Sequence, residues 1–215
     1  MSEDAFTSCE KAVRAHDPDR FFAVLFAPEA ARPHLFAVAA LHYEIAHAAA
    51  TPREPMLKAI RLMWWRETIE LARQGKPRSH AVAEALCQTL QAHDLPQVLF
   101  DQLIDARMGE EAMSPEDFAD ATVGSLMRLM AMVLGGEADL RDAAIAYGLA
   151  GRDMAGVDTA ALAKTHYARA HHAYSRALLP AVLPAALVPL YLRNPDPPLW
   201  RKQVAYLSAV LRGRI

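Results

Sequence analysis

LHYEIAHAAATPREPMLKAIRLMWWRETIEL, residues 41–71, is the most informative stretch of this chain. Alanine, leucine and other strong helix formers fill it on both sides of Pro52 and Pro55. Proline is accommodated in the first turn of a helix and breaks the helix elsewhere. The stretch therefore predicts one helix that ends near Ala50 and a second that begins at Pro55 and is stopped by Gly75.

The second of these helices carries an apolar stripe at helical spacing. Its members are Met56, Ile60, Met63, Trp64 and Leu71. A stripe of this kind usually packs against a core, so we expect it to be buried. Arg61, Trp65 and Arg66 fall on other faces, where we expect the arginines to form a solvated or ion-paired rim.

The composition predicts an all-α fold. Apolar residues make up 53% of the 215 positions, and no run alternates with period two. A helical core of this length is ordinary, so residues 1–215 are predicted to form one domain of about eight to ten helices. Other helices are expected to start at Thr7 with Glu10 in a capping box, Asp17-Pro18, Pro28, Ser79, Leu95-Pro96, Ser114-Pro115 with Asp117, Asp139, Asp158 (running to about Leu179) and Trp200.

Charge and cysteine usage exclude several classes of protein. With 23 basic and 25 acidic residues, the chain has no basic field for a nucleic-acid backbone. Cys9 and Cys87 match neither a disulfide framework nor a zinc spacing, which fits a reducing compartment. The polar start MSEDAFTSCEKAV does not resemble a signal or transit peptide, and no run of about 18 apolar residues predicts a membrane span. We therefore expect a cytoplasmic protein with no nucleic-acid partner and no transmembrane segment.

Several short motifs follow one another in a specific order. They are Ala27-Pro28, Leu35-Phe36-Ala37, Glu54-Pro55-Met56, Ile60-Arg61-Leu62, Trp64-Trp65-Arg66-Glu67, His80-Ala81-Val82-Ala83, Leu103-Ile104-Asp105-Ala106-Arg107 and Tyr147-Gly148-Leu149-Ala150. In order and spacing they resemble the squalene/phytoene synthase family over residues 17–150. Within that family the chain looks most similar to the branch that contains bacterial homologues of a mitochondrial complex I assembly factor.

The resemblance implies an all-α, isoprenoid-synthase-like helical bundle with a central pocket, in truncated form. Active members of the family join two prenyl diphosphates head to head. They hold the diphosphates through Mg²⁺ on two aspartate-rich motifs that face each other across the pocket. Hard oxygen ligands and Mg²⁺ stabilise the departure of the charged diphosphate.

The first aspartate-rich motif is missing. Ala46, His47 and Ala50 occupy the positions of its three acids, and none of them is a carboxylate. Glu44 is the one acid nearby, and a single carboxylate does not replace a cluster that shares a metal ion. This difference argues against catalysis by this chain.

The second motif is altered. After Tyr147 to Ala150, Asp153 and Asp158 lie five residues apart instead of four. Five residues turn a helix by about 500°, so the two side chains would point about 140° apart. We expect Gly156 to break the helix between them and Asp158 to cap the next helix. The segment also looks shortened relative to the family, which would remove part of the pocket wall.

Two further acids remain open to interpretation. Asp101 and Asp105 lie at i,i+4 on one helix face, where they either bind a cation or pair with Arg107 or solvent-exposed lysines. The spacings of the nine histidines do not match a zinc site.

Two functions fit these observations. The first is a non-catalytic family member that binds a prenyl or other lipid ligand, or a protein partner in respiratory complex I assembly. The second is an active prenyl or terpenoid transferase with displaced metal ligands, and only in that case is a cofactor, Mg²⁺, expected. The last helix, with Trp200, Tyr206 and Leu211 beside basic residues, is expected either to dock on the core or to touch a partner or a membrane surface, such as the inner membrane.

The candidate pocket and ligand-binding residues are Tyr43, Glu44, His47, Arg61, Trp64, Trp65, Asp101, Asp105, Tyr147 and Asp153. No catalytic residue and no metal ligand is assigned. For the transferase interpretation the displaced ligands are Glu44, Asp101, Asp105 or Asp153.

Overall fold

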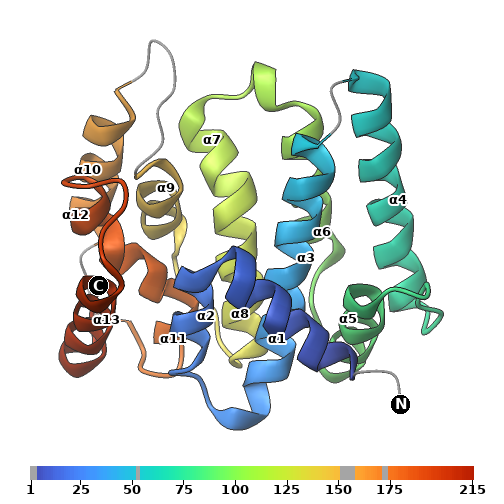
Figure 1. The fold of residues 1–215 in the computed structure, drawn as a ribbon, viewed down its shortest axis with the longest axis horizontal. Coiled ribbons are helices and arrows are strands. Elements are labelled where there is room, and N and C mark those ends of the chain that lie inside the picture. Colours follow the sequence, from blue (N-terminus) through green and yellow to red (C-terminus); the bar gives the residue numbers. More distant parts are fainter. Residues whose placement is uncertain (1–3, 52–53, 151–157, 171–173) are drawn as a thin grey trace.

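The computed structural model describes residues 4–51, 54–150, 158–170 and 174–215. Every regular element in these ranges is helical, which confirms the all-α prediction (Figure 1). The elements are α1 (Ala5–His16), α2 (Pro18–Val24), η1 (Glu29–Ala31), α3 (Arg32–Ala50), α4 (Pro55–Arg73), α5 (Ala81–Ala92), α6 (Gln97–Met108), η2 (Glu110–Ala112), α7 (Pro115–Ala119), η3 (Asp120–Gly124), α8 (Ser125–Val133), α9 (Arg141–Leu149), α10 (Thr159–Ala170), α11 (Leu179–Val182), η4 (Leu183–Leu187), α12 (Val188–Tyr191) and α13 (Leu199–Arg212). That residues 1–215 form one domain stays a prediction.

Helix α3 lies in the interior of the bundle. Each residue from 35 to 41 is at most 3% exposed, so the helix is buried on every side in this part. Helices α1, α2, α4, α5, α6 and α8 all pack against it. Figure 1 shows α4 at one end of the long axis of the molecule and α10, α12 and α13 at the other end.

Three predicted helix starts are confirmed by capping hydrogen bonds. The side chains of Asp17, Ser114 and Asp158 each accept a backbone N–H from the first turn of α2, α7 and α10, at 3.1, 3.1 and 2.9 Å. Each bond satisfies a donor that the helix itself leaves unpaired. The interpretation of Asp158 as a helix cap is therefore correct.

Two other predicted starts are wrong. Helix α1 begins at Ala5, so Thr7 lies inside the helix, and no side chain caps its N-terminus. The cap of α5 is His80 and not Ser79, because the His80 Nδ1 accepts the N–H of Val82 at 3.2 Å. In both cases a residue with good capping chemistry stands close to the helix start but does not make the bond.

The helix predicted from Asp158 to Leu179 is also wrong at its end. Helix α10 ends at Ala170, and Tyr174 makes a long-range backbone contact in place of a helical one. The backbone N–H of Tyr174 donates to the carbonyl of Gly213 at 3.3 Å. This contact with the end of the chain overrides the helical propensity of the segment.

The predicted burial of the α4 stripe is wrong as well. Met56, Ile60 and Met63 are 76%, 58% and 42% exposed. The buried face of α4 consists of Leu62, Trp65, Thr68, Ile69 and Ala72. Helix α4 lies at the edge of the bundle and packs on α3, α5 and α6 from one side only. A helix with two apolar faces does not reveal from its periodicity which of them meets the core.

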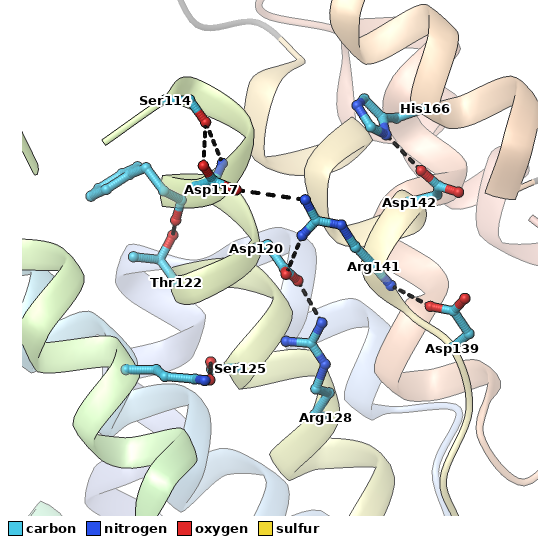
Figure 2. A network of polar contacts seen from close by, with 12 residues as sticks. Ser114, Asp117, Asp120, Thr122, Ser125, Arg128, Asp139, Arg141, Asp142 and His166 are labelled. Atoms are coloured by element: carbon cyan, nitrogen blue, oxygen red, sulfur yellow. Dashed lines mark hydrogen bonds and ion pairs between the residues drawn. The ribbon is translucent and has the colours of Figure 1, made fainter. Parts of the chain in front are cut away.

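A network of ion pairs joins α7, η3 and α8 to α9, and α9 to α10 (Figure 2). The Asp120 carboxylate, in the π-helical turn η3, pairs with Arg128 on α8 and with Arg141 on α9. On the next pair of helices, the Asp142 carboxylate of α9 lies 2.6 Å from the Nδ1 atom of His166 on α10. These contacts fix α9 and α10 against the α7–α8 segment.

Gly148, in the Tyr-Gly-Leu-Ala motif, lies where α9 approaches α7 most closely. A Cβ atom at this position would lie 2.8 Å from the Cβ of Ala119 and 3.3 Å from a methyl carbon of Val123. Since neither neighbour is the end of a flexible side chain, a larger residue would force the two helices apart.

We predict that Gly148→Ala lowers the free energy of unfolding by about 2 kcal/mol through this overpacking. Gly109→Ala is the control, because its Cβ would meet only the Asp105 carbonyl at 3.5 Å, an ordinary contact distance. Urea denaturation followed by circular dichroism measures both variants. Equal stability of the two variants would contradict the close approach of α9 and α7.

Candidate functional site

The last two turns of α3 and the middle of α4 enclose a hollow of about 320 Å³ that is open to solvent. It is lined by Glu44, His47, Ala48, Ile60, Arg61, Trp64, Trp65 and His80. Five of the ten predicted site residues thus come together: Glu44, His47, Arg61, Trp64 and Trp65. We call this hollow the α3–α4 pocket.

Two tryptophans and a histidine form the aromatic wall of the pocket. The rings of Trp64 and Trp65 meet edge to face, with centroids 4.9 Å apart. The His80 ring completes the group, with its centroid 5.2 Å from that of Trp65 and 6.0 Å from that of Trp64. The Arg78 guanidinium lies over the Trp64 ring, 4.9 Å from its centroid. These edge-to-face and cation–π contacts hold Trp64 in place although it is only half-buried.

The rest of the pocket lining is largely polar. Glu44 on α3 and Arg61 on α4, one turn before the tryptophans, carry opposite charges, and neither pairs with another residue that the structure describes. His47 lies on the last turn of α3, where the Thr51 hydroxyl donates to its backbone carbonyl at 2.6 Å. Aromatic side chains beside two unpaired charges form a surface that recognises an amphipathic ligand.

Tyr43 borders the pocket without lining it. Its ring stacks on His16 with centroids 4.3 Å apart and on His47 at 5.7 Å. Tyr43 thereby ties the end of α1 to the pocket wall on α3.

Ile60 and His80 are pocket residues that the sequence did not single out. Ile60 was assigned to a buried stripe, and His80 was quoted only as part of a motif. His80 stands at the pocket because its ring caps α5, which packs against α4. The available signal was a histidine at the start of the predicted helix, directly after Ser79.

The residues at the end of α3 do not fit a Mg²⁺–diphosphate site. Ala46 and Ala50 offer no ligand atom, so Glu44 supplies the one carboxylate on this wall of the pocket. Among the described residues, no three His, Cys, Asp or Glu side chains gather closely enough to share a metal ion. The side chains of the α3–α4 pocket therefore do not support diphosphate departure assisted by Mg²⁺.

Asp101 and Asp105 on α6 form ion pairs with an arginine on α4. Arg66 on α4 binds Asp105 directly and lies 3.8 Å from Asp101. The amide of Gln97 also donates to Asp101 at 3.1 Å. The ion-pair interpretation gave Arg107 or lysines as partners, and the structure shows that the partner is the arginine of the Trp-Trp-Arg motif.

Tyr147 belongs to a different cluster, which is centred on the buried Asp19 carboxylate. The Tyr147 hydroxyl donates to Asp19 at 3.0 Å, and the Tyr191 hydroxyl makes a second, shorter bond. Lys202 on α13 lies 2.9 Å from Asp19 and donates to the Tyr191 hydroxyl at 2.7 Å. Burial, with Asp17 and Asp19 nearby, raises the pKa of Tyr147 well above its usual value, so its hydroxyl stays a donor.

Arg20 completes this cluster. It is only 5% exposed, and its guanidinium pairs with Asp17 and lies 5.4 Å from the centroid of the Tyr147 ring. Its Nε and Nη2 atoms have no hydrogen-bond partner among the described residues. The cluster therefore joins α2 and α9 to the neighbouring helices α12 and α13, which lie far from both in the sequence.

Asp153, the last predicted site residue, lies outside the described residues, as do Gly156 and the segment that looked shortened. Predictions about them are untested.

Comparison with known proteins gives matches of two kinds. A family model described as squalene/phytoene synthase matches residues 13–151. The human and bovine proteins named NADH dehydrogenase (ubiquinone) complex I, assembly factor 6, are each 25% identical over 134 residues. The aligned region is 59% of this chain but only 40% of each relative, so the chain spans less than half of their length.

Two solved structures share the fold. Squalene synthase HpnC from Alicyclobacillus acidocaldarius superposes with a TM-score of 0.66 at 17% identity, covering 97% of this chain and 94% of that one. A dehydrosqualene synthase in complex with ligand gives 0.69 at 12% identity, covering 97% and 96%. At these identities the likeness confirms the isoprenoid-synthase-like fold alone.

We predict that Asp19→Ala lowers the free energy of unfolding by about 3 kcal/mol, because Lys202 loses its buried counter-charge. The exposed Asp94→Ala is the control and should change stability by less than about 0.5 kcal/mol. Thermal and urea denaturation measure both. A loss below about 1 kcal/mol for Asp19→Ala would show that the Asp19 cluster does not hold α2, α9, α12 and α13 together.

Proposed function

The chain belongs to the squalene/phytoene synthase family, and on that premise we propose that it is a non-catalytic binding factor. Its partner is a protein of respiratory complex I assembly, which docks on the α3–α4 pocket and the exposed face of α4. The observation that carries the proposal is this pocket, which combines the Trp-Trp-Arg helix with the end of α3, where Ala46, His47 and Ala50 offer no carboxylate.

The exposed face of α4 has the composition of a protein interface. Met56, Ile60 and Met63 are 76%, 58% and 42% exposed on the helix that also carries Trp64. Interface centres are enriched in tryptophan, methionine and arginine, and burying each aliphatic side chain contributes about 1.5–3 kcal/mol. Glu44 and Arg61, unpaired within the described chain, would meet complementary charges on the partner and set its register.

The relatives support the choice of partner. Two curated proteins with 25% identity are named as assembly factors of complex I, and the aligned part includes 40% of their length. A prenyl or lipid ligand in the α3–α4 pocket is the competing occupant. The exposure of Met56, Ile60 and Met63 favours a protein, because Met56 and Met63 lie outside the pocket lining and a small ligand would leave them in water.

The proposed location is the cytoplasm, with peripheral contact at the inner membrane. No helix in the part of the chain that the structure describes is both long enough and apolar enough to cross a bilayer.

We predict that Ile60→Glu abolishes partner binding. In the organism that carries this gene, deletion of the gene should lower complex I activity. Complementation with the Ile60→Glu variant should restore about tenfold less activity than complementation with the wild type, because the variant places a charge at the centre of the interface. Val98→Glu is the matched control, because Val98 is 56% exposed against 58% for Ile60 and lies on α6. The measurement is NADH–quinone oxidoreductase activity in membranes at equal levels of the two variants.

Full restoration by Ile60→Glu would overturn the α4 interface. Unchanged complex I activity after gene deletion would overturn the assigned pathway. If Ile60→Glu instead releases a bound isoprenoid lipid that mass spectrometry detects in the wild type, the lipid occupant replaces the protein.

We predict that the chain releases no pyrophosphate from farnesyl or geranylgeranyl diphosphate, with or without Mg²⁺. The reason is that the α3 wall has one carboxylate where a Mg²⁺–diphosphate site needs several oxygen ligands. A thermal-shift titration with the same ligands accompanies the assay. Mg²⁺-dependent release that is lost in Asp101→Ala or Asp153→Ala would establish the transferase alternative and remove the proposed function.

A further inference from the structure

Helix α13 presents an apolar stripe to solvent. Trp200, Val204, Leu207 and Leu211 recur at spacings of four, three and four residues and are 60%, 56%, 53% and 80% exposed. The opposite face is docked on the core through Tyr206 and Ala209, which are each 1% exposed. Docking of this helix on the core, the simpler expectation, is therefore observed, yet it leaves the stripe without a partner in the described chain.

The apolar surface continues from α13 onto the end of α2. A hollow of about 380 Å³ is lined by Phe22, Leu25, Phe26, Gln203, Tyr206 and Leu207. A second, of about 270 Å³, is lined by Phe26, Arg176, Leu179, Pro180, Val210 and Leu211. Phe26 borders both hollows, so the surface is continuous. We call the stripe and the two hollows together the α13 face.

The charge within helix α13 and the three residues that follow it has one sign. Residues 199–215 contain four basic residues and no aspartate or glutamate, although the whole chain has a net charge of −2. Lys202 is used internally, in its pair with Asp19. Arg201, Arg212 and Arg214 are exposed. The Arg201 guanidinium lies over the Trp200 ring, 5.3 Å from its centroid, so the aromatic and the cation stand together.

We propose that the α13 face binds the surface of an anionic lipid bilayer. A helix with a tryptophan and aliphatic stripe and basic flanks lies in the membrane interface, with its apolar side among the acyl chains and its arginines at the headgroups. Each cation near an anionic surface strengthens this attraction, so several exposed arginines act together. The two hollows beside the stripe, lined largely by apolar side chains, provide room for acyl chains.

Two other occupants fit the α13 face less well. A second copy of the chain would bring the same arginines toward one another, and like charges across an interface oppose association. A coiled-coil partner needs an apolar seam of about three to four heptads, whereas α13 has only 14 residues. Binding to a bilayer meets neither obstacle, because it brings no second set of arginines to the face and needs no long apolar seam.

The α13 face and α4 lie at opposite ends of the long axis (Figure 1). A molecule bound to a bilayer through α13 keeps α4 accessible. Membrane binding through the α13 face rests on the peripheral membrane contact in the proposed function and assigns that contact to a surface. It does not require a protein partner to bind at α4. Vesicle binding and restoration of complex I activity therefore fail separately.

The test is flotation of the full chain with vesicles of phosphatidylcholine alone and of phosphatidylcholine mixed with phosphatidylglycerol. We expect the wild type to float with the anionic vesicles only, and less at high salt. Leu211→Glu should reduce the bound fraction about tenfold, because it places an acid at the most exposed point of the stripe. Ile60→Glu, an equivalent change on α4, should float like the wild type. Circular dichroism checks that each variant is folded.

Tryptophan fluorescence provides a second readout that does not depend on Leu211. Anionic vesicles should shift the wild-type emission to shorter wavelength, and Trp200→Phe should remove the shift although Trp64 and Trp65 remain. Failure of the wild type to float, or equal flotation of Leu211→Glu, would overturn the proposal. A wild-type dimer in size-exclusion chromatography that Leu211→Glu converts to a monomer would assign the face to a second copy instead.

Discussion

The burial of α3 on every side is the constraint on which the other helices depend. Residues 35–41 are almost completely excluded from solvent, so six helices have to pack around them. Alanine at three of these seven positions lets those helices approach closely. The last turns of α3 reach the surface, and there Glu44 and His47 form a wall of the α3–α4 pocket. The pocket thus lies where the most buried helix emerges from the core.

The carboxylates near this core have structural partners. Arg66 is paired with Asp101 and Asp105, while Asp19 is paired with Lys202 and two tyrosine hydroxyls. A carboxylate held by a cation and by hydroxyl donors has little capacity left for a metal ion. These ion pairs join α4 to α6 and α2 to α13 and thereby stabilise the bundle.

The sequence predicts three of the capping residues from local signals, whereas Thr7 and Ser79, which carry an equally local signal, do not cap their helices. Asp17, Ser114 and Asp158 cap helices as expected, because a cap depends on the three residues that follow it. The stripe on α4 was assigned to the wrong environment, because burial depends on which helices lie beside α4 and not on its own periodicity. Tyr147 was placed in a ligand pocket for a similar reason, since its partner Asp19 lies 128 residues earlier. The family resemblance located five of the eight residues that line the α3–α4 pocket, but its motifs contain no information about which of their residues meet in space.

The two exposed apolar faces differ in a way that separates their roles. The face of α4 combines methionine and isoleucine with charges of both signs at the pocket, which suits a partner with a defined pattern of its own. The charged residues of α13 are all cations, which suits a surface that is uniformly anionic and has no fixed positions for its charges. Since the helices between these faces are held by buried contacts around α3 and by the Asp19 cluster, we expect binding at one end to leave the geometry of the other end unchanged. On the two proposals together, a rigid body with one specific and one non-specific face would hold its protein partner at a fixed distance from the bilayer.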